Sequence, residues 1–296
     1  MTTKLPHVAA AITVYRPDMI LLEALIKTAA SSVGRVYLFI DGPTGDAINA
    51  ADDAMLRAGP AGCIHQSKRN LGIAAGLNTL CEAAIRDGFE RIIMFDQDSE
   101  AVPDLICRLD ATLSRLVAEG TRPAAVGARP IAAEGSGTKA PRYHARAAAS
   151  GNAVPVDFVI ISGCLLNLNY WSQIGAFDEV LRMDAVDVEW GFRAWSHNCS
   201  VWVEEVSLLS HRVGTGTIRL GPVAFPRQSV DRMANYVRSQ ALLLRQRHVP
   251  IRWKLRSMIY VPLQIGVFVL SASPALATAR KLISAGRDGW IAGGRS

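Results

Sequence analysis

The chain has 296 residues, half of them hydrophobic and 20% charged, enough for one large domain or one domain with an extension. This composition excludes an intrinsically disordered chain. The five cysteines are odd in number and form no C-x-x-C pair, so the sequence argues against a disulfide framework or a zinc site and favours a reducing compartment. The N-terminal apolar run leads into a strand pattern without a small-residue cleavage site, so we interpret it as mature protein.

Charge is distributed unevenly along the chain. Residues 227–296 carry 12 Lys and Arg against two acidic residues, a net charge of +10, whereas residues 1–226 carry 20 against 24, a net charge of −4. An acidic body without a broad basic face is not typical of a nucleic-acid reader, so we expect no nucleic-acid partner. The basic tail favours contact with an anionic surface such as a membrane.

Apolar strand-like runs alternate with helical patterns through the first half of the chain. Strands are predicted at Val8–Tyr15, Arg35–Ile40, Cys63–Gln66 and Arg91–Phe95, and helices after Asp18, around Ala47–Ala58, over Gly72–Asp87 and from Pro103. This alternation implies right-handed βαβ crossovers and a mainly parallel α/β sheet. Strands that end at Tyr15, Asp41 and Asp96 place these residues on the carboxyl edge of the sheet, where such folds bind ligands.

The periodic pattern is interrupted between Pro130 and Pro155, a segment rich in Ala, Gly and Ser. We interpret it as a surface loop, and a plain connector and a substrate-covering flap are equal alternatives.

The composition changes again after Pro226. A basic helical pattern is followed by Ser257–Ala279, 23 residues without a charge, which is the length of a membrane-spanning candidate. Pro262 and Pro274 interrupt this stretch and basic residues flank it. We favour a surface-lying or re-entrant helical region, with a true span, a packed helix or an oligomer interface as alternatives. We therefore predict a first domain over residues 1–226 and a membrane-associating helical region over residues 227–296.

Two aspartates, Asp96 and Asp98, follow the buried strand RIIMF directly. Carboxylates separated by one residue at a strand end can bind one divalent ion, or an ion and a ribose hydroxyl, and Mg²⁺ and Mn²⁺ prefer such oxygen ligands together with phosphates. The alternative is a pair of surface aspartates that cap the next helix. Their position at the ligand-binding edge favours the functional interpretation.

A second acidic pair, Asp187 and Glu189, lies near the start of a predicted helix with Trp190 and Phe192. A carboxylate desolvated among aromatic side chains can act as a general base, although acids here can also simply complement the helix dipole. Upstream, Asn70 and Gly72 introduce a helix whose N-terminus can face a phosphate. His211 precedes a glycine-rich turn and, as a lone histidine, is more often structural than a ligand.

Taken in order, these segments resemble the family-2 nucleotide-sugar glycosyltransferases of the GT-A fold, specifically their bacterial rhamnosyltransferase branch. The resemblance rests on AAITVYRPD, RNLGIAAGLN, MFDQDS, ISGCLLNLNYWSQIGAFDE, MDAVDVEWGFRAW and SHRVG, spread over residues 8–215. It implies a GT-A domain followed by a basic, apolar helical extension.

The resemblance also implies roles for single residues. The nucleotide-sugar site would comprise Thr13, Tyr15, Asp41, Asn70, Gly72, Asp96, Gln97 and Asp98. Asp98 would hold a Mg²⁺ or Mn²⁺ ion that bridges the diphosphate, and His211 would complete the metal shell. Asp187 would be the catalytic base, and Trp190 and Glu189 would line the acceptor pocket.

The implied activity is metal-dependent, inverting transfer of L-rhamnose from dTDP-rhamnose to a cell-surface polysaccharide or lipid-linked glycan acceptor. The basic, apolar tail predicts that the protein lies in the cytoplasm against the inner face of a bacterial membrane, and the tail could equally pair protomers into a homo-oligomer. The alternatives are a glycosyltransferase that uses a UDP-sugar, a sugar nucleotidyltransferase, and a non-catalytic binding protein. No Gly-rich basic loop follows the first strand, which disfavours the nucleotidyltransferase.

Overall fold

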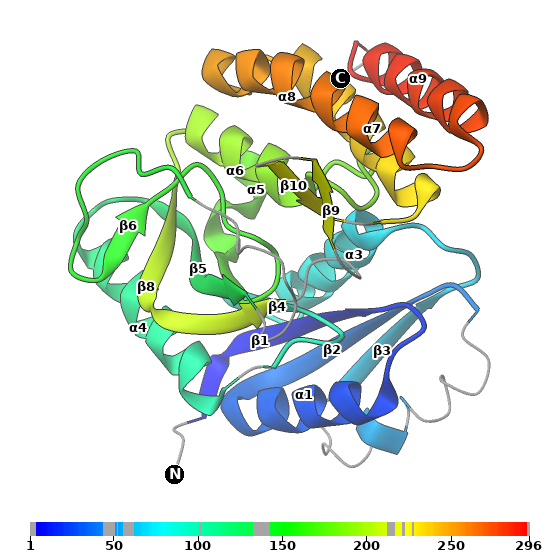
Figure 1. Cartoon of the computed structure of the whole chain (residues 1–296). Helices are drawn as coiled ribbons and strands as arrows, with labels where there is room; N and C mark the ends of the chain where they lie inside the picture. The colour runs from blue at the N-terminus through cyan, green and yellow to red at the C-terminus, as the bar shows by residue number, and fades with distance from the viewer. Residues whose placement is uncertain are drawn as a thin grey trace.

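The computed structural model describes most of the chain. The described residues are 4–43, 51, 53–55, 62–100, 102–132, 143–211, 217–220, 223–226 and 228–294. Within them, one mixed sheet lies between two layers of helices, and a further group of helices lies at the end of the molecule opposite the N-terminus (Figure 1).

Eight strands form the main sheet, in the order β3-β2-β1-β4-β7-β5-β8-β6. They are β1 (Leu5–Val14), β2 (Val33–Asp41), β3 (Gly62–Ser67), β4 (Arg91–Asp96), β5 (Pro123–Ala132), β6 (Ala153–Pro155), β7 (Cys164–Asn167) and β8 (Ser200–His211). The first four are parallel, whereas β7 runs antiparallel to both of its neighbours. β9 (Thr217–Leu220) and β10 (Val223–Pro226) form a separate antiparallel pair. The α/β fold class is confirmed.

Helices cover both faces of the main sheet. They are α1 (Met19–Ser32), α3 (Ile73–Arg86), α4 (Pro103–Ala118), the one-turn α5 (Trp171–Ile174), α6 (Val186–Ser196) and a short 3₁₀ turn (Leu168–Tyr170). Along β1, Ala9 and Ala11 pack toward α3 and α6, whereas Val8, Ala10 and Ile12 pack toward α1 and α4. Because both faces of the strand are buried, its sequence is an almost continuous apolar run.

Local signals explain several element boundaries. The Asp18 carboxylate caps α1 by accepting a hydrogen bond from the Ile20 amide at 2.9 Å, as predicted from the sequence. The helix predicted around Ala47–Ala58 lies largely outside the described residues, although residues 51 and 53–55 are helical. In the predicted 130–155 loop, β5 continues to Ala132 and β6 begins at Ala153, while residues 133–142 lie outside the described part.

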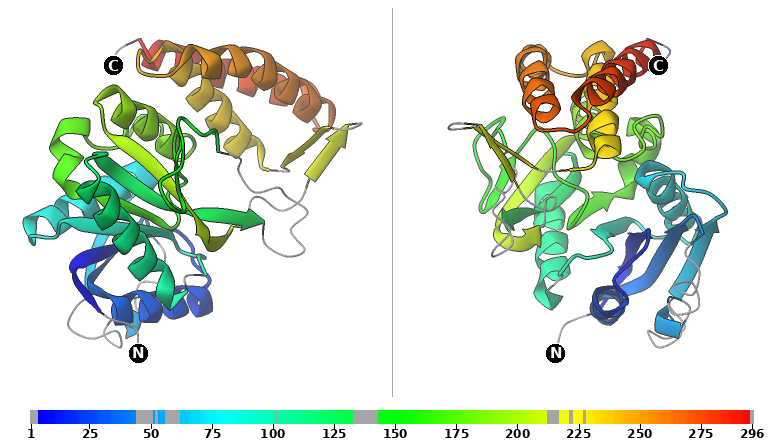
Figure 2. Two further views of the ribbon diagram at one scale, coloured as in Figure 1. Left: turned by 90° about the vertical axis from the view of Figure 1, so that its left-hand side faces the viewer. Right: turned by 45° about the vertical axis from the view of Figure 1, so that its right-hand side comes forward.

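The C-terminal region forms three helices, α7 (Val230–Arg245), α8 (Ile251–Leu270) and α9 (Ala275–Ala292). Figure 2 shows them side by side at the top of the molecule. They share a small core that includes Met233, Phe268 and Leu282. The charge-free stretch is divided between α8 and α9. No helix in the described part of the chain combines the length and the apolarity needed to cross a membrane.

Candidate active site

A cavity of about 470 Å³ lies at the carboxyl edge of the parallel strands. The predicted residues that line it are Thr13, Tyr15, Asp41, Asn70, Gly72, Asp96, Gln97, Asp98 and Asp187. Thr13 and Asp96 are directly paired between β1 and β4, which explains why the two strand ends open into one site. The side chain of His211, the other predicted metal ligand, lies outside the described residues.

Asp41 at the end of β2 holds the start of α3. Its two carboxylate oxygens accept hydrogen bonds from the backbone amides of Leu71 and Gly72, at 2.6 and 2.9 Å. Gly72 has a φ of +95°, and a Cβ there would lie 2.8 Å from the carbonyl oxygen of Arg182. Asp41 is buried, and these two hydrogen bonds fix the cavity wall at the start of α3.

The ends of β1 and β4 are joined by Gln97. Its side-chain oxygen accepts a hydrogen bond from the Tyr15 amide at 2.7 Å, and its side-chain nitrogen donates to the Tyr15 carbonyl at 3.1 Å. The side-chain amide of Gln97 therefore positions the backbone of Tyr15, a residue that lines the cavity and is 42% exposed.

Asp96 carries a perturbed carboxyl group. Burial, and secondarily the neighbouring Asp98 carboxylate, raise its pKa to about 6, while the positive charge of Arg232 opposes this shift. A carboxylate whose ionisation is disfavoured by a second carboxylate is stabilised by a cation or a hydroxyl donor. The pair is therefore suited to bind a polar or cationic group within the cavity.

Asp187 lies in the first turn of α6, facing the same cavity. Burial is again the main reason why its pKa rises to about 6, with Asp96 and Asp184 adding repulsion and the amide of Val188 opposing it through a 2.8 Å hydrogen bond. The α6 N-cap, Ala185, has a left-handed φ of 67°, a strained value for a non-glycine residue. Asp96 and Asp187, 91 residues apart in sequence, thus contribute to one cavity.

Two functional groups in the cavity, Arg232 and Asp184, were not predicted from the sequence. Arg232, in the first turn of α7, lines the cavity, and its charge opposes the rise of the Asp96 pKa. Asn235, one turn later, donates a 2.7 Å hydrogen bond to Asp184. The sequence predicted only a basic helix here. The one local feature that could have drawn attention to Arg232 is its position in the first turn after the Ser229 cap. The C-terminal region therefore completes the site.

Glu189 and Trp190, predicted for the acceptor pocket, do not line this cavity. Glu189 is buried and forms a two-pronged ion pair with Arg193 at 2.8 and 2.9 Å, and His248 Nε2 lies 2.8 Å from Oε1. Burial opposes its ionisation, but the hydrogen bonds from His248 and Arg193 outweigh this effect and lower its pKa. The structure gives Glu189 a bracing role within α6.

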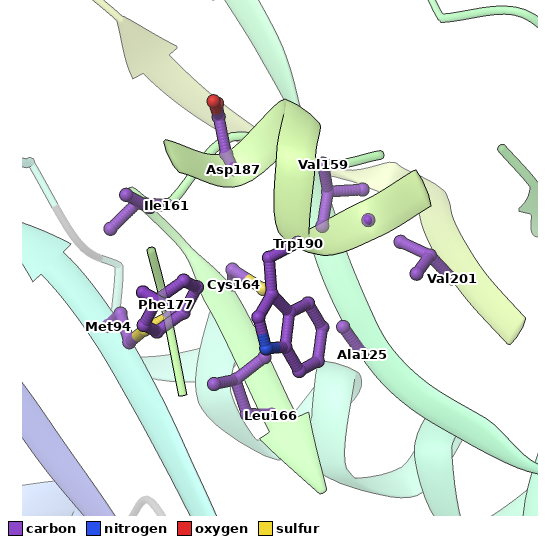
Figure 3. Close-up of a pocket in the computed structure, with 11 residues that line it drawn as sticks. Met94, Ala125, Val159, Ile161, Cys164, Leu166, Phe177, Asp187, Trp190 and Val201 are labelled. Carbon is purple, nitrogen blue, oxygen red and sulfur yellow. The ribbon is translucent and has the colours of Figure 1, made fainter. Parts of the chain in front are cut away.

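Trp190 belongs to the core beneath α6. Its indole donates a 3.0 Å hydrogen bond to the carbonyl of Gly175, and the side chain is 4% exposed. Figure 3 shows Trp190 pointing among apolar side chains such as Leu166, while the Asp187 carboxylate points away from them. The gap they surround measures about 10 Å³, roughly the space of one water molecule, so it is a packing defect and not a ligand site.

The carboxylates of the cavity fit a divalent cation that is bound partly by the protein and partly by oxygen atoms of a bound substrate. Within the described ranges, no group of three or more His, Cys, Asp and Glu side chains is placed to hold a metal ion alone. Mg²⁺ in phosphate-binding sites commonly uses one or two carboxylates together with substrate oxygens. Asp98, with Asp96 beside it, supplies carboxylates of that kind.

Comparison with known proteins gives one related sequence and many related folds. The chain is 25% identical over 226 residues to the dTDP-rhamnosyl transferase RfbF of Shigella flexneri, covering 75% of this chain and 76% of that protein. No protein-family profile matches the chain.

The similar solved structures support the fold. A structure of S. aureus TarS (residues 1–349) in complex with UDP-GlcNAc has a TM-score of 0.55 at 12% identity, over 98% of this chain and 89% of that one. A structure of GalNAc-T7 with UDP, GalNAc and Mn²⁺ has a TM-score of 0.56 at 12% identity, over 78% of this chain and 47% of that one. The chain thus spans about half of the GalNAc-T7 structure.

Proposed function

Because this chain is a family-2 nucleotide-sugar glycosyltransferase with the GT-A fold, we propose that it transfers L-rhamnose from dTDP-L-rhamnose to a glycan or lipid-linked acceptor, with inversion at the anomeric carbon. The likeness to the Shigella rhamnosyl transferase supports the donor. The observation that carries the proposal is that Asp96 and Asp187, each with a raised pKa, line one cavity at the sheet edge.

The donor lies along the strand ends. Thr13 and Tyr15 border the base, Asp96 accepts from the ribose, and Asp98 would hold a divalent ion beside the diphosphate. When bound there, Mg²⁺ or Mn²⁺ would supply positive charge that offsets the charge developing on the leaving group, an effect worth several kcal/mol. Arg232 supplies a fixed positive charge at the same cavity, so the chain itself also stabilises the leaving group.

Asp187 acts on the acceptor. Its carboxylate removes the proton from the acceptor hydroxyl while that oxygen bonds to the anomeric carbon and the bond to the diphosphate oxygen breaks. Its pKa of about 6 leaves it ionised at pH 7 yet basic enough to take a proton in the transition state. Direct displacement by the acceptor oxygen, assisted by this single base, inverts the configuration at the anomeric carbon.

The helical layer supplies a surface that suits an anionic membrane. Along α8, the side chains of Leu255, Met258 and Ile259 are exposed, and Arg252 and Lys254 lie on the same helix. An apolar face flanked by basic groups is typical of helices that lie in a membrane interface. We place the enzyme on the cytoplasmic face of the bacterial inner membrane, where a lipid-linked acceptor is accessible.

A donor screen tests the proposal. Purified protein is mixed with dTDP-rhamnose or with UDP-sugars, plus Mg²⁺ or Mn²⁺, and slow release of the nucleoside diphosphate is scored. We expect release of dTDP and its loss in excess EDTA. Preference for a UDP-sugar would reassign the donor, unchanged rates in EDTA would remove the metal role of Asp98, and pyrophosphate release from a nucleoside triphosphate and a sugar phosphate would indicate a nucleotidyltransferase.

A further inference from the structure

A second cavity, of about 270 Å³, lies between α6, α7 and α8. Asp184 and Ala185 line both this cavity and the cavity at the sheet edge. The two spaces therefore meet at the N-terminus of α6, within three residues of Asp187. Because Val188 faces the second cavity and Asp187 the first, the base stands at the boundary between them.

The walls of this second cavity combine aromatic rings with hydrogen-bonding groups. Tyr236, Trp253 and Tyr260 supply the rings, and Gln240 and Arg256 supply polar groups. The guanidinium carbon of Arg256 lies 5.9 Å from the centre of the Trp253 ring and 5.8 Å from that of Tyr260. Burial raises the pKa of Tyr236 to about 12, so its phenol stays protonated and can donate a hydrogen bond.

Trp253 is held in place by two neighbouring aromatic rings. Its ring packs edge-on against Phe192 and Phe158, with ring centres 5.3 and 5.8 Å away. Its buried indole nitrogen has no hydrogen-bond partner within the described structure. Less than 1 Å² of this nitrogen is exposed, so Trp253 contributes its ring, and not its N–H group, to the cavity wall.

We propose that this second cavity is the acceptor subsite and that it binds a neutral saccharide ring, one hydroxyl of which reaches Asp187. A sugar ring has an apolar C–H face, which packs on the rings of Trp253 and Tyr260, and an edge of hydroxyls, which accept from Tyr236 and donate to Gln240. The inference rests on the proposed function, since only a transferase needs a second substrate beside the base. The source is either a free saccharide or the sugar of a lipid-linked glycan.

Two substitutions probe the cavity without touching the donor site. Tyr260→Ala removes a partly exposed ring, and Trp253→Phe keeps an aromatic ring against Phe192 but presents a smaller ring to the cavity. Ile283→Ala on α9, at a position that is 71% exposed and outside the cavity, is the matched control. Thermal melting of all three variants identifies any that fail to fold, and either cavity variant alone suffices for the test.

Binding of methyl and octyl glycosides of rhamnose, glucose and N-acetylglucosamine is measured by titration calorimetry with dTDP present. At least one glycoside is expected to bind to the wild type. Tyr260→Ala is expected to weaken its binding about tenfold, Trp253→Phe about two- to tenfold, and Ile283→Ala not at all. Equal affinity for methyl and octyl forms indicates a free saccharide, and preference for octyl forms a lipid-linked one.

Separate outcomes overturn the two proposals. No binding by any glycoside, or the same affinity in the cavity variants and the control, rejects the acceptor subsite whichever donor the enzyme uses. Failure of the wild type to release dTDP from dTDP-rhamnose rejects the proposed donor and leaves the glycoside result unaffected.

Discussion

The sheet edge and the C-terminal helical layer contribute to the two cavities in different ways. At the sheet edge, each residue follows a strand or starts a helix, so local sequence fixes its place: Asp96 directly follows four buried residues of β4. In the helical layer, Arg232 and Trp253 reach the cavities only because α7 and α8 pack against α6. Chemistry at a strand end is thus readable from local pattern, whereas chemistry contributed by docked helices requires the tertiary structure.

The largest effect should come from removing the base at the cavity boundary. Asp187→Asn is expected to lower the transfer rate about 10²- to 10⁴-fold, because the acceptor hydroxyl loses its general base. Affinity for dTDP should stay within about threefold of the wild type, because Asp187 does not belong to the nucleotide site. Transfer kinetics and calorimetry with dTDP check the two parts, with the exposed Asp288→Asn on α9 as control. Full activity in Asp187→Asn would assign the base elsewhere.

Substitution of the neighbouring acid, Glu189, should lower the stability of the fold, whereas substitution of Asp187 lowers the transfer rate. Glu189→Gln leaves Arg193 and His248 without their anionic partner in a buried position, so we expect a loss of about 3–5 kcal/mol in the free energy of unfolding. Urea denaturation measures this, with the exposed Glu82→Gln on α3 as control. Unchanged stability together with a raised acceptor KM would instead support the acceptor-pocket role predicted from the sequence.

The contrast between these two acids shows where sequence analysis reaches its limit. Asp187 and Glu189 lie two residues apart in the first turn of one helix, and residues at that spacing do not face the same side. One carboxylate therefore meets the cavity and the other the core, but only the position of α6 on the sheet decides which. The sequence predicted an acidic site there, and the resemblance, not the spacing, selected Asp187.

The parallel half of the fold was predictable because its signals are local. The Asp18 cap, the strand before Asp96 and the resemblance to family-2 glycosyltransferases are all confirmed. The antiparallel insertion of β7 was not predicted, because pairing between distant strands leaves no local pattern. Similarly, the charge-free stretch Ser257–Ala279 has the length of a span but is divided between α8 and α9.

A substitution in the helical layer tests whether it completes the donor site. Arg232→Gln removes the positive charge that α7 brings to the cavity, and we expect dTDP affinity to fall about 10- to 100-fold, the range for a hydrogen bond to a charged group. Calorimetry with dTDP measures the loss.

Arg287→Gln, at an exposed position on α9, is the charge-matched control and should bind dTDP like the wild type. Equal affinity in both variants would mean that the sheet edge binds the nucleotide without help from α7, and that the helical layer contributes only to the second cavity.

The smallest expected effect is a gain of stability at the sheet-edge cavity. Asp187 has a pKa of about 6 in the folded protein against 3.8 for the ordinary group, so the folded state binds its proton more tightly. The contribution of the protonated Asp187 carboxyl group to the free energy of unfolding is fully present below about pH 4, and it is lost as the pH rises through 6. Asn cannot ionise, so Asp187→Asn should gain about 1–3 kcal/mol over the wild type at pH 7 and almost nothing at pH 4.

Urea denaturation at the two pH values measures this difference, with Asp288→Asn expected to stay within about 0.5 kcal/mol of the wild type at both. A gain that does not depend on pH would mean that Asp187 is not held in a desolvated, repulsive setting. The same residue is thus expected to lower stability in the free enzyme and to be required for transfer, as is common where a buried charge is kept for catalysis.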